Sequence, residues 1–147
     1  MAQGHKWLSG AAFTMALVAL MLIAAGARPS QAEDGIIYVD ADAPGPTHDG
    51  ATWDTAFTEL QPALDAAITG DEIWVASGTY KPTDTTDRNI SFRMKNGVAI
   101  YGGFDPSTGD TAWEDRDWVL HESILSGDLN GDDGSDFANR EDNSYHV

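Results

Sequence analysis

The chain has no cysteine among its 147 residues, and it has only eight basic residues against 24 acidic ones. Without cysteine, disulfides are excluded, so packing, a bound metal or neighbouring repeats must stabilise the fold. The formal net charge of −16 excludes a nucleic-acid-binding surface, because phosphate contacts need clustered Lys and Arg. The same charge repels anionic lipid headgroups and soluble polyanions unless a divalent cation bridges them.

Acidic residues are also missing from the N-terminus, since every one of them lies at or beyond Glu33. Residues 8–27 are almost wholly apolar, and Ser30-Gln31-Ala32 offers small residues two positions apart. This pattern predicts a signal peptide over residues 1–32, cleaved after Ala32, and a secreted or cell-surface protein, extracellular or at the outer membrane. The alternative is an uncleaved leader that anchors the chain in the membrane, because residues 8–27 are long enough to span a bilayer.

Residues 33–147 remain after that cleavage, enough for a single domain. Four short segments within it are β-branched and aromatic and predict strands: residues 36–39, 73–76, 97–104 and 124–126. Ile73, Ile100 and Ile124 recur at intervals of 27 and 24 residues. Such an interval is typical of a stacked repeat, so we expect the three isoleucines to be interior positions of successive coils.

An amphipathic segment after the first predicted strand predicts a helix over residues 58–67. Thr58 and Gln61 have the spacing of a capping box, which would place Pro62 in or just beyond the first turn. The expected apolar face follows the 3, 4, 7 spacing of one helix side and consists of Trp53, Ala56, Phe57, Leu60, Leu64, Ala67 and Ile68.

The chain resembles the opening of secreted bacterial right-handed parallel β-helix proteins in Ile37-Tyr-Val-Asp40, Gly50-Ala-Thr-Trp53, Gly70-Asp-Glu-Ile-Trp-Val-Ala76 and Val98-Ala-Ile-Tyr-Gly-Gly-Phe104. These proteins belong to the pectin-lyase-like superfamily and include relatives of the chlamydial polymorphic outer-membrane proteins. The resemblance implies an all-β fold, a right-handed parallel β-helix solenoid. Residues 33–147 would then form its N-terminal capping helix, which covers open strand edges, and only the first few coils of a truncated chain. The alternative is an ordinary α+β domain with one helix on a small sheet.

One acidic loop has the residue types of a metal site. Asp128, Asn130 and Asp132 place oxygen ligands at alternate positions, as Ca²⁺ prefers. The match to an EF-hand ends there, because Asp133 stands where Gly is required and Asn139 stands where a bidentate Glu is required. A looser Ca²⁺ site and a solvated acidic turn both stay open.

The sequence contains no recognisable catalytic motif. Adjacent Asp132 and Asp133 do not supply the facing carboxyls that glycoside hydrolysis needs. The six basic residues of the mature chain form no recognisable cluster with the acids, as a lyase would require. The fold that the resemblance implies hosts lyases, hydrolases, adhesins and structural coats alike. We therefore expect a non-catalytic exported module, scaffold-like or adhesin-like, that binds carbohydrate or another surface protein. The alternative is the N-terminal part of a carbohydrate-active lyase or hydrolase whose active residues lie beyond Val147.

Three further expectations concern side-chain positions. His121, beside a predicted strand, should lie at the surface. The connection over residues 105–117 should fold back onto the body through Trp113 and Trp118. Aromatic residues of the predicted strands should pack in the core rather than form a sugar-stacking strip. They are Trp74, Tyr80, Tyr101 and Phe104.

Overall fold

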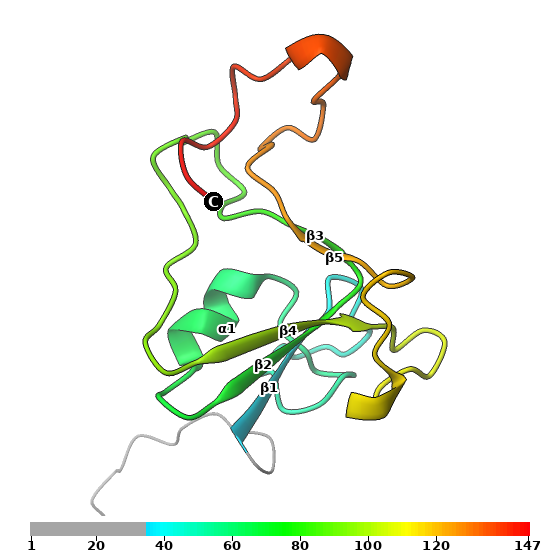
Figure 1. The fold of residues 1–147 in the computed structure, drawn as a ribbon. Coiled ribbons are helices and arrows are strands. Elements are labelled where there is room, and N and C mark those ends of the chain that lie inside the picture. The colour runs from blue at the N-terminus through cyan, green and yellow to red at the C-terminus, as the bar shows by residue number, and fades with distance from the viewer. Residues whose placement is uncertain (1–34) are drawn as a thin grey trace, which may run out of the picture.

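The computed structural model describes residues 35–147, and its main element is a three-stranded parallel sheet (Figure 1). The strand order is β1-β2-β4, and a second, two-stranded parallel sheet pairs β3 with β5. The predicted signal peptide lies outside the described residues. The elements are β1 (Ile36–Val39), α1 (Leu60–Ala66), β2 (Glu72–Ala76), β3 (Gly78–Tyr80), β4 (Ala99–Phe104), the 3₁₀ turn η2 (Trp113–Asp115), β5 (Ser123–Leu125) and the 3₁₀ turn η3 (Ser135–Phe137).

The predicted all-β, right-handed parallel β-helix is wrong for these residues. They form a small mixed fold with two short parallel sheets and one helix, which is closer to the alternative of one helix on a small sheet. The isoleucine repeat shows where the expectation fails. Ile73 does pair with Ile100 in register, but Ile124 pairs with Thr79 in the other sheet and is 46% exposed. The third isoleucine therefore does not continue the stack.

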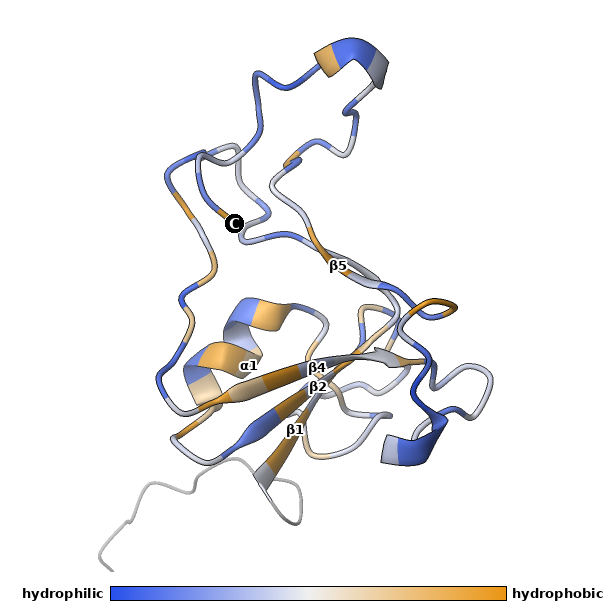
Figure 2. Cartoon of the chain, viewed as in Figure 1, coloured by the Kyte–Doolittle hydropathy of each residue, from blue (hydrophilic) through white to orange (hydrophobic). Residues whose placement is uncertain are grey.

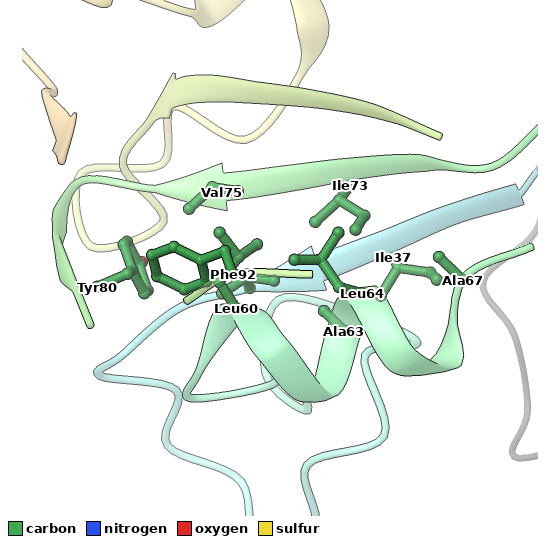
Figure 3. Packing of buried hydrophobic residues seen from close by; sticks show 10 residues of the cluster. Ile37, Leu60, Ala63, Leu64, Ala67, Ile73, Val75, Tyr80 and Phe92 are labelled. Atoms are coloured by element: carbon green, nitrogen blue, oxygen red, sulfur yellow. The ribbon is translucent and has the colours of Figure 1, made fainter. Parts of the chain in front are cut away.

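Helix α1 covers one face of the three-stranded sheet (Figure 3). Its inward residues follow the 3, 4, 7 spacing of one helix side, and they meet alternate residues of β1 and β2. Burying each large aliphatic side chain contributes about 1.5–3 kcal/mol relative to leaving it exposed. The helix contributes Leu60, Ala63, Leu64 and the adjoining Ala67, and the strands contribute Ile37, Val39, Ile73 and Val75.

The opposite face of the sheet carries an aromatic cluster. Tyr38, Trp74 and Tyr101 are register partners across β1, β2 and β4. A β-bulge in β4, opposite Val75, turns Phe104 to the same side, where its ring stacks on Trp74 with centroids 4.7 Å apart. Trp74, Tyr80 and Phe104 are buried, which confirms their predicted core position, although Tyr80 packs with the aliphatic residues. Tyr101 is only half-buried, so the prediction is wrong for this residue.

A loop, not the helix, covers the outer edge of β1. The backbone N–H of Tyr38 donates to the carbonyl of Gly50 at 3.0 Å, and that of Phe57 donates to the carbonyl of Tyr38 at 2.9 Å. The predicted covering of strand edges by a capping helix is therefore wrong. The segment between Asp49 and Phe57 runs beside β1 and satisfies its backbone groups, and a bridge between Val39 and Phe57 ends this pairing.

Helix α1 begins later than the sequence predicts. Its N-cap is Glu59, which makes no side-chain capping bond, so the predicted capping box of Thr58 and Gln61 does not form. Gln61 instead bonds to Asp65 one turn on, at 2.8 Å. Pro62 does lie in the first turn, as predicted, where its missing N–H has no helical partner to lose.

The segments around residues 82–89 and 126–147 extend away from the main sheet, at the top of Figure 1. Figure 2 shows that hydrophobic residues concentrate in the strands and α1, whereas this upper part is mainly hydrophilic. Tyr145 connects the two segments, since its N–H donates to the Arg88 carbonyl at 2.9 Å. Within residues 35–147, no helix is both long and apolar enough to cross a membrane.

Candidate functional site

A pocket of about 320 Å³ opens where the three parallel strands of the main sheet end. Asp40 directly follows β1, Ser77 directly follows β2 and Asp105 directly follows β4, and all three residues line the pocket. In Figure 1 this is the edge toward which the arrowhead of β4 points, and β1 and β2 run parallel to β4. Ligands of open parallel sheets bind at this carboxyl edge, because loops from neighbouring strands converge there. The pocket is therefore the leading candidate site.

Trp53 forms an aromatic wall of this pocket. It belongs to the loop that covers β1, and its half-buried ring lies 4.7 Å from Tyr38 and 5.3 Å from Phe104, centroid to centroid. Its indole Nε1 donates to the Thr111 carbonyl at 3.3 Å. The ring is thus held by aromatic residues of the sheet and, at its Nε1 edge, by the loop after β4, which fixes the wall without closing the pocket.

Asp40 supplies the most deeply placed carboxylate of the pocket, only 9% exposed. Its Oδ1 accepts the backbone N–H of Asp42 at 2.9 Å, while Oδ2 has no hydrogen-bond partner within residues 35–147. Burial raises the pKa of Asp40 above its ordinary value. The hydrogen bond from the Asp42 backbone lowers this pKa, and the nearby negative charges of Asp42 and Asp105 raise it further. One oxygen of the Asp40 carboxylate is therefore open to a ligand in the pocket.

Asp105 begins a tight turn that forms the opposite rim. Its Oδ1 accepts both the N–H and the hydroxyl of Ser107, at 3.0 and 2.6 Å. The Ser107 hydroxyl is the main reason that the pKa of Asp105 is lowered. Backbone hydrogen bonds between Asp105 and Asp110, both 3.0 Å long, close the turn. The rim of the pocket is consequently a fixed structure.

His121 reinforces this turn from behind. Its Nε2 lies 3.0 Å from Oδ2 of Asp110, and its Nδ1 lies 3.4 Å from Oδ2 of Asp105. The side chain is buried, with the residue 8% exposed, so the prediction that His121 lies at the surface is wrong. His121 lies 11 residues after Asp110 in the chain, and folding brings its ring against the rim. The local sequence does not indicate this contact.

The pocket has a strongly negative lining. Besides Asp40 and Asp105, the exposed Asp42 and Asp54 contribute carboxylates, and among the described residues the lining contains no Lys, Arg or His. Carboxylates around one concave, partly desolvated surface reinforce each other's negative potential. This potential attracts positively charged or strongly hydrogen-bond-donating ligands.

The predicted metal ligands lie elsewhere, in the extended upper part. Asp128 and Asp132 come together, and the fold adds Asp142, so that one oxygen from each of the three lies within 4.8 Å of the others. Asn130 contributes its backbone rather than a coordinating side chain, with its N–H donating to Asp142 Oδ2 at 2.7 Å. The sequence-based set Asp128, Asn130 and Asp132 is thus brought together only in part.

The electrostatics of this acidic loop show how it is held together. Backbone N–H groups of Gly131, Asp132 and Asp133 donate to the Asp128 carboxylate and lower its pKa. The pKa of Asp132 is raised, first by desolvation and then by the charges of Asp142 and Asp128. Three close carboxylate oxygens are a chemically suitable donor set for Ca²⁺, so binding there stays a prediction.

The pocket and Asp142 were both missed by the sequence-based reasoning. The pocket had a usable signal, because a polar residue directly follows three predicted strands, at Asp40, Ser77 and Asp105. Trp53 was assigned to the helix face instead, because its spacing continued the apolar pattern. Asp142 carried no local signal, since the loop that returns it beside Asp128 is set by tertiary contacts.

Comparison with protein-family models, with curated proteins and with solved structures finds no match for this chain. Its function must therefore be argued from the site itself, because a fold class alone specifies no activity.

Proposed function

We propose that this protein is an exported, non-catalytic binding module that acts at the cell surface or outside the cell, and that the pocket between Asp40, Trp53 and Asp105 is its binding site. Its ligand is a carbohydrate or a segment of a surface protein. The observation that carries the proposal is Asp40, a residue that is 9% exposed, lines the pocket and keeps one carboxylate oxygen without a partner among the described residues.

The energetic cost of Asp40 supports a binding role. An ionised carboxylate that is partly desolvated without full compensation destabilises the folded state, and its raised pKa reflects this cost. A core position could have been filled by an apolar residue at no such cost. A ligand that donates hydrogen bonds or positive charge to Oδ2 would restore the lost interactions. A volume of about 320 Å³ lies within the range of small-molecule sites.

The alternative, a carbohydrate-active lyase or hydrolase, gains no support from the pocket. A lyase needs a base beside its substrate, and the described lining contains no basic side chain. A hydrolase needs a second free carboxyl facing the first. Asp105 does not offer one, because Ser107 engages its Oδ1 and His121 contacts its Oδ2. The two other carboxylates of the lining, from Asp42 and Asp54, are exposed to solvent rather than held in a desolvated position opposite Asp40. The lining is therefore better suited to holding a ligand than to proton transfer.

Export is the part of the proposal that the N-terminal sequence supports, through the apolar stretch over residues 8–27 and the small residues before Glu33. N-terminal sequencing of the protein released by its producing cells should give Glu33 as the first residue. A released protein that begins at Met1 would contradict cleavage.

Binding is tested by two-dimensional NMR of the indole N–H signals, with neutral, acidic and amine-bearing oligosaccharides and peptides as a panel. We expect at least one class to shift the Trp53 signal, and Asp40→Asn to weaken that response. Glu141→Gln is the matched control, because it removes one negative charge from an exposed residue that does not line the pocket. If the whole panel leaves the Trp53 signal unmoved, the pocket is not a binding site.

A further inference from the structure

We infer that the pocket selects a small organic ammonium ion, such as a protonated amino sugar or alkylamine, over neutral ligands of the same shape. This inference rests on the proposed function, since it names the chemical class that the same pocket takes. It stands on three observations: the sign of the lining charges, the spacing of the carboxylates and the aromatic wall.

The charges favour a cation over a neutral ligand. Four residues with carboxylates line the pocket, namely Asp40, Asp42, Asp54 and Asp105. The described lining contains no positively charged side chain. A neutral ligand would leave these charges uncompensated while displacing the water that solvates them. A ligand with one ammonium group supplies both the compensating charge and donors for the open Asp40 Oδ2.

The spacing of the carboxylates favours an organic cation over a metal ion. Within residues 35–147, the only three acidic or histidine side chains whose ligand atoms converge within 4.8 Å are those of Asp128, Asp132 and Asp142. The pocket carboxylates are therefore too spread out for three of them to coordinate one ion. They surround a volume of about 320 Å³ instead, which suits a cation carried on a larger molecule.

The aromatic wall gives such a cation a second favourable contact. Ammonium groups are attracted to the faces of aromatic rings, and tryptophan gives the strongest attraction. The same cluster already holds one cation, since the Arg116 guanidinium lies 4.4 Å from the centre of the Trp113 ring and 5.4 Å from that of Phe104. Phe104 in turn packs on Trp53, with ring centroids 5.3 Å apart. Trp53 is the member of this cluster that lines the pocket.

The test compares three ligands that share one ring. D-Glucosamine carries an ammonium group at about pH 6, below the pKa of such an amine. N-Acetyl-D-glucosamine and D-glucose are neutral, and tetramethylammonium chloride supplies the cation without the sugar. Each is titrated into the purified protein at constant ionic strength, with the Trp53 indole N–H shift as readout. We expect glucosamine and tetramethylammonium to bind, with glucosamine roughly tenfold tighter than either neutral sugar.

Two variants separate a local contact from general charge attraction. Asp40→Asn, which keeps the size and the acceptor for the Asp42 N–H, should weaken glucosamine binding roughly tenfold. Glu141→Gln should leave it within about twofold. Equal weakening by both variants would show long-range attraction and overturn the inference. Equal affinity for glucosamine and the neutral sugars would also overturn it, but would leave the proposed binding function standing. Binding of the neutral sugars without binding of glucosamine would also overturn the inference and leave the proposed binding function standing.

Discussion

At the scale of single residues, Gly50 shows how closely the edge loop approaches the sheet. Its φ of +73° lies in the left-handed region, and a Cβ there would lie 2.7 Å from the Phe57 ring and 2.9 Å from Ile37 Cγ2. The left-handed conformation and the missing side chain are therefore both required. With a side chain at this position the loop could not form its backbone hydrogen bonds with β1, and Trp53 would lose its position beside the pocket.

We predict that Gly50→Ala lowers the free energy of unfolding by about 2–4 kcal/mol, because it adds a steric clash to the roughly 1–2 kcal/mol cost of a left-handed non-glycine residue. Gly109→Ala is the matched control, since its φ is +93° but nothing lies within 4 Å of the added Cβ. Urea unfolding of the two variants separates the free-energy cost of the left-handed backbone, which both share, from that of the steric clash, which only Gly50→Ala has. Equal losses would contradict the close approach at Gly50.

Asp40 gives a prediction with a defined pH dependence. Because its pKa is raised from the ordinary value of 3.8, the folded state binds more protons than the unfolded state between these two values. Its contribution to stability therefore falls as pH rises through the folded-state pKa. Asp40→Asn should be more stable than the wild-type protein near neutral pH, and this advantage should vanish in acid.

Thermal unfolding of both proteins across pH measures this difference, with Glu141→Gln as the control for net charge. A wild-type protein that is the more stable one at neutral pH would show that the ionised Asp40 is compensated inside the ligand-free pocket.

At the scale of elements, the sequence predicts the strands better than their surroundings. Residues 36–39 form β1 as predicted, and β2, β4 and β5 lie within two residues of the expected bounds, because β-branched and aromatic runs mark them. Strand β3 was not identified as a strand, since three residues carry too little pattern. Trp113 does fold back onto Trp74 and Tyr101, as predicted, whereas Trp118 is 69% exposed and does not.

The acidic loop carries a prediction in which the structure and the sequence differ. If the loop binds Ca²⁺, Asp142 should be a ligand and the Asn130 side chain should not. Asp142→Asn should then abolish the heat of Ca²⁺ binding in calorimetry, and Asn130→Ala should leave it nearly unchanged. Chelation of the ion should lower the melting temperature of the wild-type protein, because a bound ligand stabilises the folded state. No heat at millimolar Ca²⁺ would end the prediction of a calcium site.

At the scale of the whole molecule, the main sheet has two different faces. Ile37 and Ile73 face α1 and build the aliphatic core, while Tyr38 and Trp74 face the aromatic cluster and lead to the pocket. Strand alternation predicts this division from sequence. The pocket could not be predicted in the same way, because it joins residues from loops that are far apart in the chain and meet only once the strands pair in parallel.

The two-faced arrangement predicts which isoleucines are essential. Ile73→Asp should unfold the domain, because it places a charge among fully buried residues between α1 and the sheet. Ile124→Asp should cost no more than about 1 kcal/mol, because that side chain is partly in water and belongs to the other sheet. Circular dichroism melts of the two variants distinguish them. If both variants unfold the domain, Ile73 and Ile124 occupy equivalent interior positions, as the repeat spacing indicates.

We expect the carboxyl edge of the parallel sheet to bind a ligand between Asp40 and Trp53. The most direct test is to locate a bound molecule by intermolecular nuclear Overhauser effects, with glucosamine as the first probe. We expect contacts from the ligand to the Trp53 ring and to Pro106, which both line the pocket. Contacts confined to the exposed Trp118, outside this pocket, would contradict it.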